Sequence, residues 1–96
     1  MNNSIYYPDD CIAALATPWG TSALSVIRTS GNGAIEAVAH CFSPPERILK
    51  AKGHSVVHGT LLDPGSKESL DDVLAAVFRA PKSYTGEDSV ELFVHG

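Results

Sequence analysis

The sequence has few of the features that mark secreted or membrane proteins. It carries two cysteines, Cys11 and Cys41, whereas a disulfide-stabilised secreted domain this small usually carries more, so we expect two free, buried thiols. Residues 1–4 include no basic side chain, and the longest apolar run, Cys11–Ala16, is too short to cross a bilayer. The sequence therefore predicts a cytoplasmic protein with no membrane partner.

A surplus of positive charge is also missing. Eleven acidic residues against seven basic ones give a net charge of −4, and no block of like charge occurs. Because a phosphate backbone is usually met by a broad basic surface, we do not expect this segment to bind nucleic acid by charge alone. With 44% apolar and 19% charged residues, the composition is that of a globular chain with a core.

Several catalytic and metal-binding motifs are absent from the sequence. No Gly-x-x-x-x-Gly-Lys-Ser/Thr stretch occurs, so these residues alone cannot form a P-loop nucleotide site. His54 and His58 would stand about 13 Å apart along one strand, too far to share one metal ion. No Gly-x-Ser-x-Gly signature supports a serine hydrolase. We predict no metal site and no catalytic residue in this segment.

The first half of the chain has the pattern of two strands followed by a helix. Residues 11–17 and 23–29 are short apolar or β-branched runs, and Gly31-Asn32-Gly33 after them favours a strand-to-helix turn. Ile35, Val38, Ala39 and Phe42 then follow the i, i+3, i+4, i+7 spacing of a helix that Pro44 and Pro45 stop.

The second half has the pattern of a hairpin and a last strand. Residues 54–62 and 70–80 are its arms, although local rules leave a helix open for the second arm, and Asp63-Pro64-Gly65 predicts a type II turn. Residues 89–94 alternate as a strand that ends almost at the last residue. We expect an α+β fold with a mixed sheet of about five strands and one or two helices. One sheet face would then need cover from further chain or a second copy.

Arg28 and Glu91 are the candidate site residues, because both are charged and lie within apolar strands. One interpretation is a cross-strand ion pair or exposure on the solvent face. The other is a pocket for a polar heterocycle, in which the carboxylate accepts an adjacent N–H and amino group while the guanidinium forks onto carbonyl or carboxylate groups. The patterning alone does not name a ligand.

Three segments in order resemble the start of the MnmE/TrmE family of tRNA modification GTPases. They are Asp10–Pro18 with Gly20, Ser25–Gly31, and the distinctive stretch Ala80–Glu91, after which His95-Gly96 falls where the family continues into a further glycine. The resemblance implies residues 1–96 as an N-terminal folate-binding and dimerisation domain, similar in fold to the aminomethyltransferase group of the glycine cleavage system. It implies Arg28 and Glu91 as contacts to a tetrahydrofolate derivative, 5-formyl- or 5,10-methylene-tetrahydrofolate.

The same resemblance implies what the rest of such a protein does. A downstream domain would bind GTP with magnesium and potassium and hydrolyse it, and the homodimer would act with an MnmG-type flavoprotein. Together they would modify carbon 5 of the wobble uridine of tRNA with an aminomethyl-type or carboxymethylaminomethyl-type group. Two alternatives stay open: a folate-dependent aminomethyltransferase-type domain without a GTPase, and a structural dimerisation module only.

Overall fold

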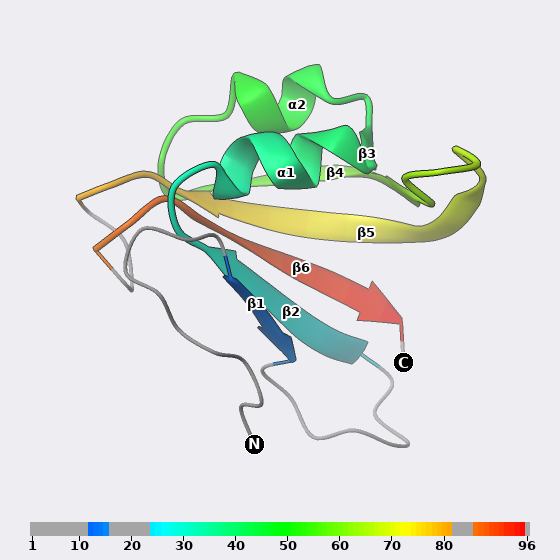
Figure 1. The fold of residues 1–96 in the computed structure, drawn as a ribbon, viewed down its shortest axis with the longest axis horizontal. Coiled ribbons are helices and arrows are strands. Elements are labelled where there is room, and N and C mark those ends of the chain that lie inside the picture. The colour runs from blue at the N-terminus through cyan, green and yellow to red at the C-terminus, as the bar shows by residue number, and fades with distance from the viewer. Residues whose placement is uncertain (1–11, 16–23, 82–85, 96) are drawn as a thin grey trace.

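Six strands and two short helices make up the described part of the chain. The computed structural model describes residues 12–15, 24–81 and 86–95. In chain order the elements are β1 (Ile12–Leu15), β2 (Leu24–Ser30), α1 (Ala34–His40), β3 (Phe42–Ser43), α2 (Glu46–Leu49), β4 (Ser55–Leu62), β5 (Ser69–Phe78) and β6 (Ser89–His95) (Figure 1). The predicted loop after the first strand and the centre of the 80–91 stretch lie outside the described residues.

The strands form one sheet in the order β1-β2-β6-β5-β4-β3. The α+β class is confirmed. Every pairing among the described strands is antiparallel, and the two-residue β3 brings their number to six. The short β4–β5 connection imposes antiparallel pairing on its arms. β6 then inserts between β2 and β5, which brings strands far apart in the sequence side by side.

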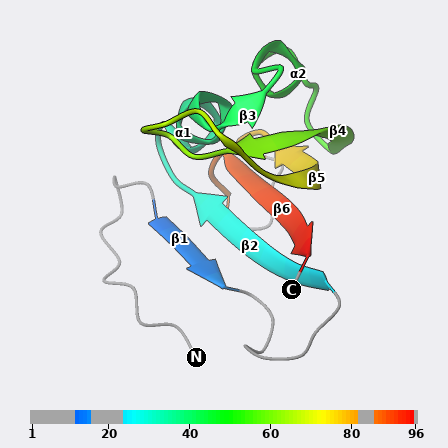
Figure 2. The same ribbon diagram turned by 90° about the vertical axis from the view of Figure 1, so that its right-hand side faces the viewer.

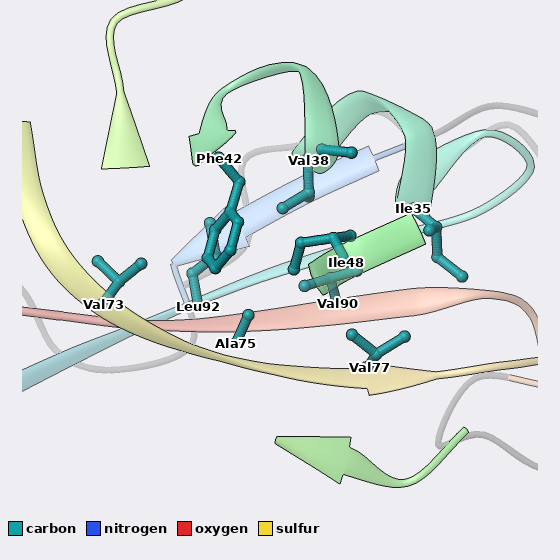
Figure 3. Close-up of a cluster of buried hydrophobic side chains, with 10 residues drawn as sticks. Ile35, Val38, Phe42, Ile48, Val73, Ala75, Val77, Val90 and Leu92 are labelled. Atoms are coloured by element: carbon teal, nitrogen blue, oxygen red, sulfur yellow. The ribbon is translucent and has the colours of Figure 1, made fainter. Parts of the chain in front are cut away.

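Both helices lie on one side of the sheet, where they enclose the core (Figure 2). Side chains from both helices, β3, β5 and β6 meet there, with Ile35, Val38 and Ala39 of α1 almost fully buried as the helical stripe predicts (Figure 3). The helix ends at His40, so Phe42 belongs to β3 and not to the helix, although it is only 1% exposed. None of the described residues forms a helix on the opposite side of the sheet.

Phe42 reaches the core because Gly59 leaves room for its ring. A Cβ at Gly59 of β4 would overlap the Phe42 ring and lie 2.7 Å from the carbonyl oxygen of Ser43. Any side chain at this position would therefore push β3 away from β4. Because Gly59 has no side chain, β3 and β4 can approach closely, which is a common reason for a glycine within a strand.

Helix α2 was not predicted from the sequence. Two consecutive prolines indicated only the end of the preceding helix, whereas Pro45 caps a one-turn helix over Glu46–Leu49. Proline suits this position, because its fixed φ is already helical and its missing N–H has no partner to lose at a helix start. Burial of Ile48, at 0% exposure, attaches the turn to the core.

The predicted hairpin is confirmed, but its turn differs from the type II prediction. The second arm is strand β5, not a helix, and it pairs with β4 along most of its length. A type II turn would need a positive φ at Gly65, yet the left-handed residue of the loop is Lys67, with φ 64°. The side chain of Asp63 accepts the N–H groups of Gly65 and Ser66, both at 2.9 Å, and so organises a longer loop.

The connection from β2 to α1 is the predicted strand-to-helix turn. Gly33 caps α1 with φ 86°, a conformation that costs glycine little and other residues more. At the far end of the helix, Cys41 is a free thiol, as predicted, but it is half-buried, not buried. Its sulfur lies 3.5 Å from the carbonyl oxygen of Ala37. Cys11 lies outside the described residues.

Candidate functional site

The structure brings Arg28 and Glu91 together as direct cross-strand partners. The β2–β6 register places the two residues opposite one another. The Nε of Arg28 donates to Oε2 of Glu91 at 2.6 Å, and Nη2 lies 2.6 Å from the same oxygen. The side chains remain 35% and 17% exposed, so the pair is only partly withdrawn from water. The predicted cross-strand ion pair is confirmed. The ion pair does not exclude a ligand contact by the same two residues.

One oxygen of the Glu91 carboxylate, Oε1, has no partner among the described residues. Both contacts from Arg28 end on Oε2, and within the described residues Glu91 has no other side-chain partner. Its neighbour on β5 is Ala76, whose methyl group is too short to cover the carboxylate. An ionised carboxylate has two acceptor oxygens with about four lone-pair positions, so Glu91 can accept further donors from above the sheet.

The pair lies on the side of the sheet opposite α1 and α2. Residues that pair directly across antiparallel strands point to the same side, so Val26, Leu74, Phe93 and Val56 accompany Arg28 and Glu91 there. We call this surface, defined by these six residues, the open face. Val56 is 63% exposed and Leu74 45% exposed, although both are large and apolar. Apolar residues gathered on one surface mark an interaction site.

A hollow of about 610 Å³ lies on the open face beside the ion pair. Its apolar surface includes Val56, Leu74 and Phe93, and its polar members are His58, Asp72 and His95. Arg28 and Glu91 do not line it, but Phe93 stands two residues beyond Glu91 on the same side of β6. A volume of this size, mostly apolar with a few polar groups, is typical of small-molecule sites.

Asp71 fixes the end of β6 at the rim of this hollow. Its carboxylate accepts the backbone N–H of His95 at 2.8 Å and lies 2.8 Å from Nδ1 of the same residue. The backbone N–H, followed by the ring, holds the pKa of Asp71 below its ordinary value. Sequence reasoning missed this contact, because Asp71 and His95 lie 24 positions apart and become neighbours only through the β5–β6 pairing.

Asp88 is a second positioning residue that the sequence alone did not identify. Its carboxylate oxygen Oδ1 accepts the N–H of Ala80 at 2.8 Å, and its backbone oxygen accepts the N–H of Gly31 at 2.9 Å. These bonds tie the end of β5 and the turn after β2 to the start of β6. Asp88 therefore anchors the strand that carries Glu91. In the sequence, only its position within the 80–91 stretch pointed to this residue.

A group of metal ligands and a helix that could span a membrane are both absent from the described residues. Among them, no three His, Cys, Asp or Glu side chains are grouped to hold a metal ion. None of their helices is long and apolar enough to cross a membrane.

Comparison with known proteins assigns the chain to a family. The sequence model of the family described as "GTP-binding protein TrmE N-terminus" matches residues 11–96. A tRNA modification GTPase MnmE from Borrelia recurrentis is 49% identical over 92 residues, which cover 96% of this chain and 20% of that protein. The protein of the same name from Treponema denticola is 50% identical over 91 residues, covering 95% of this chain and 19% of that protein.

A third relative, from Moorella thermoacetica, is 50% identical over 90 residues and carries the same name. The match takes in 92% of this chain and 20% of that protein, so the chain spans about a fifth of the length of the curated relatives it matches. The match of the family model over 11–96 includes β2 and β6 and thus the Arg28–Glu91 pair. The chain belongs to the TrmE N-terminal family, the N-terminal domain of the tRNA modification GTPases named MnmE.

Proposed function

We propose that this domain binds a tetrahydrofolate derivative through Arg28 and Glu91 and dimerises as part of a tRNA modification GTPase. The observation that carries the proposal is the half-buried ion pair on the open face, with one carboxylate oxygen unused and a ligand-sized hollow beside it. Membership of the family supports the wider role, since the relatives are named for tRNA modification and GTP hydrolysis.

The geometry of the pair suits the edge of a pterin ring. Such an edge presents an N–H and an amino group side by side, which match the two oxygens of one carboxylate. Glu91 would accept one donor on its unused Oε1 and share Oε2 with Arg28. Arg28 in turn holds the carboxylate by two nitrogens at 2.6 Å, so its orientation is fixed before a ligand arrives.

The hollow provides apolar surface for the rest of such a ligand. Phe93 and Leu74 pair directly across β6 and β5, and both contribute to the hollow. An aromatic ring lying against them would bury apolar area on both sides of the contact, and apolar burial supplies most of the affinity of small-molecule sites. Polar recognition at Glu91 and apolar contact at Phe93 would then fall along one strand.

The activity of the whole protein is proposed at a coarser level. The domain would position the one-carbon donor and hold two subunits together, while GTP hydrolysis, with its magnesium and potassium, takes place in another domain. With an MnmG-type flavoprotein, the cytoplasmic complex would modify carbon 5 of the wobble uridine of tRNA. No catalytic residue is assigned to the present chain.

Calorimetric titration of 5-formyltetrahydrofolate into the whole protein tests the folate role. Glu91→Gln keeps the size of the side chain but replaces one acceptor oxygen with a donor, so we expect binding to weaken about tenfold or more. Glu36→Gln, an exposed glutamate on α1 at the other side of the sheet, is the matched control and should bind like the wild type. A folded wild-type protein that gives no binding heat, or a Glu91→Gln variant of unchanged affinity, rejects the proposal.

A further inference from the structure

Basic side chains gather at one corner of this acidic domain. Four of its seven basic residues, Arg47, Lys50, Lys52 and Arg79, lie on α2, just after it, and at the end of β5. We call these four residues the α2 patch. Between residues 44 and 62 the only acid is Glu46, while ten of the eleven acids lie in the rest of the chain. Charge is therefore separated within the domain. The net charge of −4, from which we expected no binding of nucleic acid by charge alone, does not describe this corner.

Hydrogen bonds to the backbone hold the two arginines in this corner. Nε of Arg79 donates to the carbonyl oxygen of Ala51 at 2.8 Å, and Nη2 donates to that of Leu49 at 2.9 Å. The two acceptor residues are the chain neighbours of Lys50. Nη1 of Arg47 donates to the carbonyl oxygen of His58 at 2.7 Å. Both arginines keep their full charge in these bonds, because a carbonyl group does not neutralise a guanidinium.

The two lysines of the patch are exposed and unpaired. In the part of the chain that the structure describes, neither Lys50 nor Lys52 has an ion-pair or hydrogen-bond partner for its ammonium group. Two acids follow Arg79 before β6, namely Glu87, which has an interaction of its own, and Asp88, whose Oδ1 accepts the N–H of Ala80. Neither forms an ion pair with Arg79, whose guanidinium donates to backbone carbonyl groups. The positive charge of the patch is thus largely uncompensated, and such a surface attracts polyanions.

We propose that the α2 patch binds the phosphate backbone of RNA, with tRNA as the partner in the whole protein. The inference rests on the proposed function, because the polyanion is identified through the tRNA modification for which the relatives are named. Exposed Lys and Arg side chains are the groups that contact phosphates and release counterions from them. The patch belongs to the helix side of the sheet, so RNA there would leave the open face free for folate and a second subunit.

Salt-dependent binding of a labelled tRNA to the whole protein tests this proposal. The double variant Lys50→Gln/Lys52→Gln removes two phosphate contacts, so we expect the slope of log K against log salt to become shallower by about 1.4 to 1.8, and affinity near 100 mM salt to fall about tenfold. Lys67→Glu changes the net charge by the same amount in the β4–β5 loop and is the matched control. It should retain most of the affinity and the full slope.

Each other outcome overturns the proposal. Equal affinity and slope in the double variant would remove the patch from RNA binding, and an equal loss in Lys67→Glu would show that only net charge matters. Loss of binding to phosphatidylglycerol vesicles without loss of tRNA binding would assign the patch to a lipid surface. A wild-type protein that binds no tRNA would overturn both this proposal and the tRNA part of the proposed function. The folate titration is independent, and unchanged folate binding by the double variant confirms that it is folded.

Discussion

At the scale of single residues, the main feature is the ion pair between Arg28 and Glu91. Each is a charge among apolar neighbours, and the β2–β6 register places them in contact, with two nitrogens on one oxygen. A partly exposed ion pair contributes little net stability, because water screens it. Its value in the proposed site is orientation, because the arginine holds the carboxylate through Oε2 and leaves Oε1 without a contact to Arg28.

Asp71 provides a prediction about pH at the same scale. Because the backbone N–H of His95 lowers its pKa in the folded state, the ionised carboxylate stabilises the fold above about pH 4. This contribution is lost as the pH falls through the lower, folded-state pKa. A carbon-13 NMR titration of the Asp71 carboxyl should give a midpoint below the ordinary value of 3.8.

The variant His95→Ala separates the two causes of this shift. It removes the ring but keeps the backbone N–H, which is the larger cause. The midpoint of Asp71 should therefore rise only partway toward its ordinary value. A full return to that value would assign the shift to the imidazole ring and contradict the hydrogen-bond account.

At the scale of elements, the short helix α2 depends for its stability on one buried side chain, that of Ile48. A helix of four residues has too few internal hydrogen bonds to persist alone, since nucleation is costly. Its stability in this fold comes from packing of Ile48 against the core cluster. Arg79 adds to this, because it donates to the carbonyl oxygen of Leu49, the last residue of the helix, and to that of Ala51 just beyond it.

Neighbouring substitutions in α2 test this account. Ile48→Ala should lower the free energy of unfolding by about 2 to 4 kcal/mol, because it leaves a cavity under the helix. Leu49→Ala, next in the chain but 46% exposed, should change it by no more than about 0.5 kcal/mol. Urea denaturation of both variants gives the comparison. Equal losses would contradict the account in which burial of Ile48 holds α2.

At the scale of the whole domain, both described helices cover the same side of the sheet. The covered side holds the core between both helices and the strands, whereas the open face exposes Val56 and Leu74. A layer of secondary structure buries its apolar side against another layer. A second copy of the domain is the layer that we propose, in agreement with the expected homodimer.

Sedimentation of the whole protein tests the role of the open face. Leu74→Asp puts a charge in the centre of this face, so we expect the dimer to dissociate at least about tenfold more readily, since an unpaired charge is costly to bury. Leu49→Asp is the matched control, because Leu49 is 46% exposed and Leu74 45%, but Leu49 lies on α2. If both variants sediment like the wild type, subunit contacts do not use the open face near Leu74.

The sequence alone determined the periodic elements and the two charged residues. Alternation and helical spacing are local properties, so the strands around Arg28 and Glu91, the hairpin and the stripe of α1 could be predicted from neighbouring residues. The fit of Phe42 over Gly59, the one-turn α2 and the left-handed Lys67 could not, because each depends on packing or loop geometry.

Which residues come into contact depends on the tertiary structure. The insertion of β6 between β2 and β5 sets Glu91 against Arg28, 63 positions away, and His95 against Asp71, 24 positions away. The same insertion places Phe93 beside Leu74 at the hollow. Strand order and register are properties of the assembled sheet, fixed when the strands bury one face together, and no local pattern encodes them.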